Sequence, residues 1–161
     1  MPVIGTERHD SGFTITAEFD APVERVWQLW ADPRQLERWW GPPGYPATFV
    51  RHDFAVPGMS IYWMPGESGE QNYAGWEFVS IDPPVSLVVD NGFADQEGRP
   101  AGDLAWNRFT VGLEAIGTGT RMTITAGFDS PEHAEQMISL GMLEGSVAAL
   151  GQADAILAEG G

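Results

Sequence analysis

The sequence predicts an α+β domain in which a curved antiparallel sheet of about six or seven strands wraps around a long C-terminal helix. Three observations carry this prediction. An alternating strand leads directly into two short helical patterns rich in tryptophan. The middle of the chain alternates in period two between turn signals, and a helical pattern occupies its end. A cavity is expected between the sheet and the long helix, closed by the short helices.

The first strand is predicted from Phe13 to Phe19, where apolar and polar residues alternate. A helix then begins near Pro22, because proline at a first helical position loses no hydrogen bond. Its apolar residues recur at i, i+3, i+4 and i+7, and a second helix repeats this pattern after a break at Asp32-Pro33. These positions are Val23, Val26, Trp27 and Trp30, followed by Leu36, Trp39 and Trp40.

From about Ala47 to Phe128 the chain is predicted to form successive strands joined by short turns. Short connections favour an antiparallel meander over parallel strands with helical crossovers. The expected turns are Pro57-Gly58, Pro65–Gly69, Asp82-Pro83-Pro84, the longer loop Ala94–Asp103, and Gly117–Gly119.

The last helix is predicted from Pro131 to about Ala158, with Ser130 as its N-terminal cap. Leucines and valines form one stripe along it, and small residues form a second stripe. Gly141 and Gly145 in the small stripe weaken a helix by about 1 kcal/mol each relative to alanine. They indicate either close backbone packing or space left open for a ligand.

The 161 residues fit one domain, residues 1–161, with a flexible lead over about residues 1–11. The chain has no cysteine, which excludes disulfides and thiolate metal sites. The N-terminus lacks the pattern of a secretory signal, and no run of about 18 apolar residues predicts a membrane span. A cytoplasmic location is expected.

The formal net charge is -15, with 23 acidic residues against eight arginines and no lysine. Such a surface repels phosphate backbones and anionic lipid headgroups. Neither nucleic acid nor a membrane is therefore expected as a partner. A homodimer stays open as an alternative, since two-fold dimers are the commonest oligomers.

Five segments carry a resemblance to a known family: FDAPVERVWQLWADPRQLERWWGPP, DFAVPGM, GWEFVSIDPPVSLV, the alternating Gly119–Phe128 strand and GMLEGSVAAL. Together they resemble the START-like superfamily, also called SRPBCC, birch-pollen-allergen-like or helix-grip. Within it the chain is most similar to the family of activators of heat-shock-protein-90 ATPase and their homologues. The resemblance implies the helix-grip fold and a pocket, but proteins of this fold include lipid carriers, hormone receptors, cyclase subunits and co-chaperone domains.

Two departures from the family pattern matter. The chain has Gly58-Met59 where the family often has paired glycines, and Gly145-Ser146 where it often has glycine followed by tryptophan. A serine in place of an indole on a core-facing position leaves volume unfilled. A larger cavity near Ser146 is therefore expected.

Aromatic and methionine side chains are the leading candidates for ligand contacts, because small-molecule pockets are mainly apolar with a few polar groups. For each tryptophan taken singly, filling the core is the competing interpretation. The candidate ligand-binding residues are Trp27, Trp30, Trp39, Trp40, Trp63, Trp76, Trp106, Met122, Met137, Met142 and Ser146.

Catalytic and metal sites have little support in the sequence. His9, His52 and His133 share no ligand spacing, and His52 and Asp53 point to opposite faces of a strand, so no metal is predicted. No Walker or dinucleotide motif is present, so no cofactor is predicted. Polar groups that could face a pocket are Asp53, Glu77, Asp90, Arg108, Tyr45, Tyr62 and Tyr73, although alternation turns Arg108 away from the core.

Three functions follow in order of preference. The first is binding of a small hydrophobic or aromatic molecule in the cavity. The second is a cavity enzyme of cyclase, hydratase or hydrolase type, which needs a titratable residue inside. The third is a co-chaperone-like interaction domain, which needs an exposed apolar patch. The sequence leaves open whether any reaction is catalysed.

Overall fold

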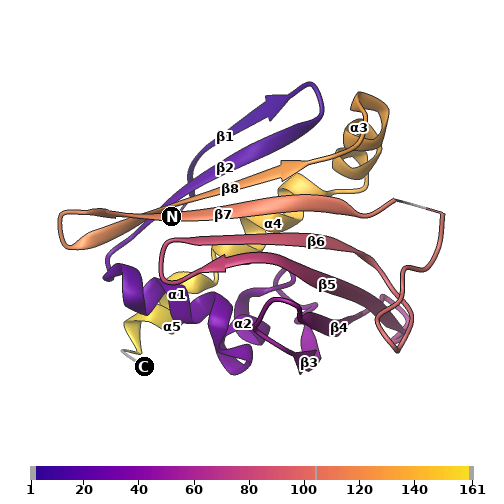
Figure 1. Ribbon diagram of the computed structural model, residues 1–161, viewed down its shortest axis with the longest axis horizontal. Helices are drawn as coiled ribbons and strands as arrows, with labels where there is room; N and C mark the ends of the chain where they lie inside the picture. Colours follow the sequence, from indigo (N-terminus) through magenta and orange to yellow (C-terminus); the bar gives the residue numbers. More distant parts are fainter. Residues whose placement is uncertain (1–2, 104, 160–161) are drawn as a thin grey trace.

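A single antiparallel sheet forms most of the protein (Figure 1). The computed structural model describes residues 3–103 and 105–159. The strands are β1 (Val3–His9), β2 (Gly12–Phe19), β3 (Thr48–His52), β4 (Met59–Pro65), β5 (Gln71–Asp82), β6 (Ser86–Phe93), β7 (Asn107–Ile116) and β8 (Gly119–Gly127). Their order across the sheet is β1-β2-β8-β7-β6-β5-β4-β3, so every neighbour except the β2–β8 pair is consecutive in sequence.

The sheet has eight strands, whereas six or seven were predicted. Strand β1 occupies Val3–His9, within the segment expected to be a flexible lead; residues 1–2 lie outside the described residues. Strand β1 pairs with β2 from Val3 opposite Ala17 to His9 opposite Gly12. Its side chains are almost all exposed, so the apolar alternation that reveals a half-buried strand is missing from its sequence.

The two short helices predicted after the alternating Phe13–Phe19 segment are present as α1 (Val23–Ala31) and α2 (Pro33–Trp39). The break between them is capped locally. The Asp32 carboxylate accepts a hydrogen bond from the Arg34 backbone N–H at 3.0 Å, and Pro33 occupies the first position of α2. Each helix buries one apolar face in the core, through Trp27 and Trp30 of α1 and Trp39 of α2.

The prediction of one continuous C-terminal helix over 131–158 is wrong. Three helices replace it: α3 (Pro131–Ser139), α4 (Met142–Leu150) and α5 (Ala153–Ala158). Ser130 caps α3 as predicted, because its hydroxyl oxygen accepts a hydrogen bond from the His133 backbone N–H at 3.0 Å. Gly141 adopts a left-handed conformation, φ 96°, which ends α3 and redirects the chain. Leu140 of the predicted apolar stripe is consequently 65% exposed.

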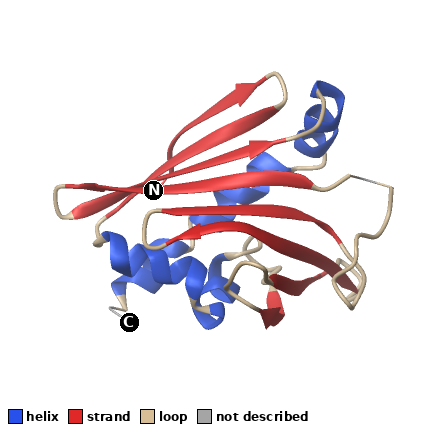
Figure 2. Cartoon of the chain, viewed as in Figure 1, coloured by secondary structure: helices blue, strands red, loops and turns tan. Residues whose placement is uncertain are grey.

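Helix α4 crosses behind the sheet, while α1, α2 and α5 gather at one end of it (Figure 2). The face of the sheet turned toward α4, called the inner face here, carries the core. One continuous apolar row crosses five strands through directly paired residues: Phe78, Val89, Phe109, Ala126 and Phe13. Burial of such rows is the main stabilising contribution in a domain of this kind.

Candidate ligand-binding cavity

A cavity of about 330 Å³ lies between the inner face and α4. Pockets for small molecules range from roughly 300 to 1,000 Å³, so this one suits a small ligand. Its wall is mostly aromatic and aliphatic, and none of the lining side chains among the described residues is charged. The lining residues are Phe13, Trp39, Trp40, Gly41, Pro42, Met64, Asn91, Phe93, Phe109, Ile124, Ala126, Met137, Leu140, Gly141, Met142, Gly145, Ser146, Ala149 and Leu150.

The mouth of the cavity is marked by two exposed apolar side chains. Phe93, at the end of β6, is 45% exposed, and Leu140, at the break between α3 and α4, is 65% exposed. Both also line the cavity. Gly141, which follows Leu140 and breaks the predicted helix, lines the cavity as well.

Five predicted ligand-contact residues line the cavity: Trp39, Trp40, Met137, Met142 and Ser146. The other six lie elsewhere. Trp27, Trp30, Trp76 and Met122 are buried in the core, and the Trp30 indole N–H is directed at the Met122 sulfur at 3.3 Å. Trp63 and Trp106 are half-buried and lie on the outer face of the sheet. Residue type alone does not separate core from lining, because both environments favour the same side chains.

Ser146 lies where the sequence predicted unfilled volume. Its hydroxyl donates to the Met142 carbonyl at 2.8 Å, one turn back along α4. Gly145 beside it also lines the cavity and has open space where a side chain would be. Gly145 and Ser146 therefore leave the α4 side of the cavity unfilled.

A row of polar side chains crosses the inner face next to the apolar row. Directly paired residues on β3 to β7 form it: His52, Ser60, Trp76, Asn91 and Asn107. Ser60 and Trp76 are fully buried, and Asn107 is nearly so. Asn91 is the member that lines the cavity.

Sequence reasoning missed Asn91 and Asn107, although a signal was available. Asn91 continues the inward parity of Leu87 and Val89, and Asn107 that of Phe109 and Val111. Asparagine is rarely buried without hydrogen-bonded partners, so its presence at an inward position indicates a polar site inside the domain.

Tyr62, one of the predicted pocket-facing polar groups, connects to this row. Its hydroxyl donates to Asn91 Oδ1 at 3.2 Å, and Asn91 Nδ2 donates to Asn107 Oδ1 at 3.4 Å. Burial raises the pKa of Tyr62 to about 12, and the indole N–H groups of Trp40 and Trp76, which face its oxygen, partly oppose that rise. Tyr62 is therefore a neutral hydrogen-bond donor at physiological pH.

His52 closes the other end of the row. Its Nε2 lies 3.0 Å from the Trp30 carbonyl oxygen, which can only accept, so Nε2 carries the proton. Nδ1 then accepts from the Ser60 hydroxyl at 2.7 Å. Burial lowers the pKa of His52, an effect that the bond to Trp30 partly offsets. Both ring nitrogens are used structurally, and the buried Ser60 is not accessible as a nucleophile.

This lowered pKa of His52 predicts a pH-dependent stability. In the unfolded chain the His52 imidazole binds a proton near pH 6.5, whereas in the folded protein it does so only at lower pH. The contribution of neutral His52 to the free energy of unfolding is therefore present above pH 6.5 and is lost as the pH falls. Urea unfolding of wild type and His52→Gln should show a stability difference that shrinks from about pH 7 to about pH 5. A difference independent of pH would contradict this assignment.

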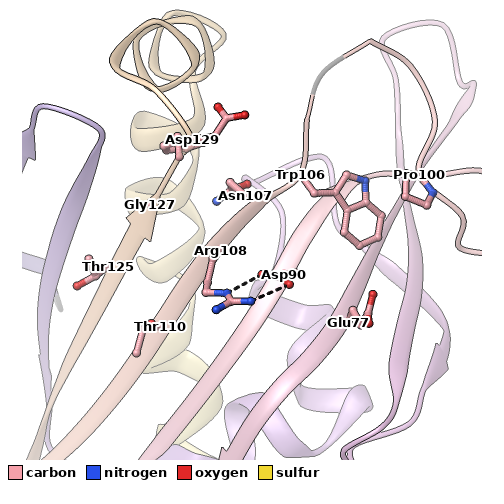
Figure 3. Close-up of a pocket in the computed structure, with 11 residues that line it drawn as sticks. Glu77, Asp90, Pro100, Trp106, Asn107, Arg108, Thr110, Thr125, Gly127 and Asp129 are labelled. Carbon is pink, nitrogen blue, oxygen red and sulfur yellow. Dashed lines mark hydrogen bonds and ion pairs between the residues drawn. The ribbon is translucent and has the colours of Figure 1, made fainter.

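A second hollow, an open groove of about 670 Å³, lies on the outer face (Figure 3). Arg108 and Asp90 form a two-bond ion pair there, at 2.8 and 3.1 Å, as the outward orientation predicted for Arg108 requires. The Trp106 ring covers Gly92, where any Cβ would lie 2.1 Å from the indole, and its N–H donates to the Phe93 carbonyl. These groups satisfy one another, so the groove is a weaker candidate site than the cavity.

Within 3–103 and 105–159, histidines, aspartates and glutamates do not gather into a group of three that could hold a metal ion. The described helices are also too short or too polar to span a membrane.

Comparison with known proteins decides the family. The family model described as "Activator of Hsp90 ATPase homolog 1-like protein" matches residues 20–158. The chain belongs to this family. The matched region begins at the end of β2 and includes the whole cavity-forming part of α4. The helix-grip fold expected from the sequence resemblance is confirmed.

Several solved structures are similar to this chain over most of its length. A protein from Arthrobacter aurescens is 46% identical, with 98% of this chain and 92% of that chain covered and a TM-score of 0.91. Protein Ms6760 from Mycobacterium smegmatis is 40% identical, covers 97% of both chains and has a TM-score of 0.89. CalU16 from Micromonospora echinospora, at 16% identity and a TM-score of 0.62 over 98% and 84% of the chains, shares the fold alone. The comparison with curated proteins finds no match.

Proposed function

We propose that this protein binds a small, uncharged hydrophobic or aromatic molecule in the cavity between the sheet and α4. The composition of the cavity wall carries the proposal. Aromatic, aliphatic and methionine side chains surround about 330 Å³, with Asn91 and Ser146 as the polar side chains among the lining residues. Apolar surface removed from water stabilises such a complex by about 25 cal/mol per Å².

The charge of the protein also supports an uncharged ligand. A carboxylate or ammonium group placed inside would lose its hydration without gaining an opposite charge, since the cavity wall has none. The net charge of -15 further disfavours the approach of anions.

Methionine methyl groups provide the experiment that tests the proposal. Met64, Met137 and Met142 line the cavity, whereas Met59 does not. With ¹³C-methyl-labelled methionine, saturating 2-ethylnaphthalene should shift the first three NMR signals and leave Met59 unchanged. Absence of any saturable shift, or equal shifts at all methionines, would reject binding in this cavity.

The enzymatic alternative has less support. General acid–base catalysis needs a titratable group within hydrogen-bond reach of the substrate. Within residues 3–103 and 105–159, the cavity-lining side chains include no carboxylate, imidazole or amine. The nearby Tyr62 hydroxyl has its pKa raised to about 12 and is bonded to Asn91.

Activation of a heat-shock ATPase is the further alternative, suggested by the family description. Stable docking on a chaperone would use a contiguous apolar patch. Exposed apolar side chains are instead spread over separate elements, for example Ile4 on β1, Val50 on β3 and Val79 on β5. Ligand binding is therefore ranked above this function.

A further inference from the structure

We propose that the ligand carries a hydrogen-bond acceptor, such as a ketone oxygen, and that the side-chain amide of Asn91 recognises it. This inference rests on the proposed function, because it names the chemistry of a ligand in the same cavity. Three observations carry it: the position of Asn91, the orientation of its amide, and an unpaired N–H group on the neighbouring Asn107.

Asn91 brings the polar row to the cavity. It lies on β6 between Trp76 of β5 and Asn107 of β7, and it lines the cavity wall. The other polar side chain of the wall, Ser146, already donates its hydroxyl hydrogen to the Met142 carbonyl. Asn91 therefore offers an amide N–H at the cavity wall.

The orientation of the Asn91 amide follows from Tyr62. The Tyr62 oxygen is faced by the indole N–H groups of Trp40 and Trp76, so its own hydrogen must point to an acceptor. That acceptor is Asn91 Oδ1, 3.2 Å away. Nδ2 of Asn91 then lies on the side of Asn107 and donates one hydrogen to Asn107 Oδ1, with 3.4 Å between nitrogen and oxygen. Among the described residues, its second hydrogen has no acceptor.

A second amide N–H group lies next to Asn91. Asn107 Nδ2 is buried and has no hydrogen-bond partner within the described part of the chain. Buried polar atoms almost always have a partner, so this unpaired N–H group indicates a missing acceptor beside Asn91. The partial positive charges of the Asn91 and Asn107 N–H groups favour a ligand that places an oxygen, rather than an N–H or O–H, at this end.

Tyr62 and Asn107 act as positioning residues in this arrangement. Each is nearly fully buried and holds one end of the Asn91 amide, so the amide is fixed before the ligand enters. Preorganised donors lose little entropy on binding, which raises selectivity for the matching acceptor.

A matched pair of ligands tests the proposal. 2-Acetylnaphthalene carries a carbonyl group where 2-ethylnaphthalene carries a methylene, and the two have similar shapes. Replacing Asn91 with leucine should weaken binding of the ketone about tenfold or more, because the carbonyl loses its donor inside an apolar site. Binding of the hydrocarbon should stay unchanged or tighten. Calorimetry or methionine-methyl NMR measures both affinities.

Two further variants separate recognition from structure. Tyr62→Phe keeps the aromatic ring but removes the hydroxyl that orients the Asn91 amide. It should therefore reduce the preference for 2-acetylnaphthalene without weakening the binding of 2-ethylnaphthalene. Ser146→Ala removes the other polar group of the wall and should leave the preference intact. Because ligand and residue are varied together, a general loss of stability affects both ligands and cancels in the comparison.

The carbonyl stretch of ¹³C=O-labelled 2-acetylnaphthalene gives a readout that needs no variant. In the wild-type complex it should lie at lower frequency than in an apolar solvent, as hydrogen bonding requires, and should return to the apolar value in Asn91→Leu. An apolar-solvent frequency in wild type, or equal losses of affinity for both ligands in Asn91→Leu, would overturn the inference while leaving cavity binding in place. Failure of both ligands to bind wild type would reject the proposed function itself.

Discussion

Replacing Ser146 with tryptophan is expected to abolish most ligand binding while raising stability. Ser146 lines a cavity of about 330 Å³ from the helix side, so an indole at this position projects into the volume that the ligand would occupy. Burying a large apolar side chain is worth about 2 kcal/mol, and the ligand must displace it to enter. Affinity for 2-ethylnaphthalene should therefore fall by about thirtyfold or more.

The same substitution should raise the free energy of unfolding by about 1 kcal/mol, because it fills apolar space that is otherwise empty. Ala148→Trp, exposed on the same helix, adds an indole outside the cavity and should change neither property strongly. Calorimetric titration and urea unfolding measure the two effects. Unchanged affinity in Ser146→Trp would place the ligand somewhere other than this cavity.

Trp30→Ala is expected to have the largest effect on stability. Trp30 is fully buried, and its ring lies 4.8 Å from that of Trp39, 5.8 Å from Trp40 and 6.0 Å from Phe109, measured between centroids. Removing a buried indole eliminates these contacts and leaves a cavity, which costs about 3–5 kcal/mol. That is a large share of the roughly 5–15 kcal/mol that holds a domain folded.

Trp63→Ala is the matched control for this prediction. Trp63 is half-buried on the outer face of β4, so its removal should cost about 1 kcal/mol, the typical effect of a point mutation. Urea midpoints with unchanged slopes would give both values. If Trp30→Ala does not fold, Trp30→Phe replaces it and should still exceed the control. Equal losses at the two positions would contradict a central role for Trp30 in the core.

Local rules made much of the fold predictable. The alternation of Phe13–Phe19, the proline-separated helices and the turn at Gly117 each depend on neighbouring residues, and the structure has all three. Strand β1 and the break at Gly141 were missed for a different reason. Exposed residues on β1 leave no apolar pattern, and a glycine is compatible with both a helix and its end.

The site was less predictable than the fold. Ser146 could be singled out because it departs from a family pattern, and it does line the cavity. The tryptophans could not be sorted by type, since Trp40 of the wall and Trp30 of the core are equally apolar. Only strand register brings Asn91 beside Asn107 and Trp76, because their positions are 16 and 15 residues away along the chain.

The sequence by itself determined the α+β class, the family and the presence of an apolar interior, because these depend on periodicity and composition that each segment carries. Tertiary structure alone decided which side chains surround the cavity, where it opens, and that its polar end presents N–H groups. Those properties arise from the pairing of distant strands and from one left-handed glycine, Gly141, and such long-range geometry is not encoded in any local pattern.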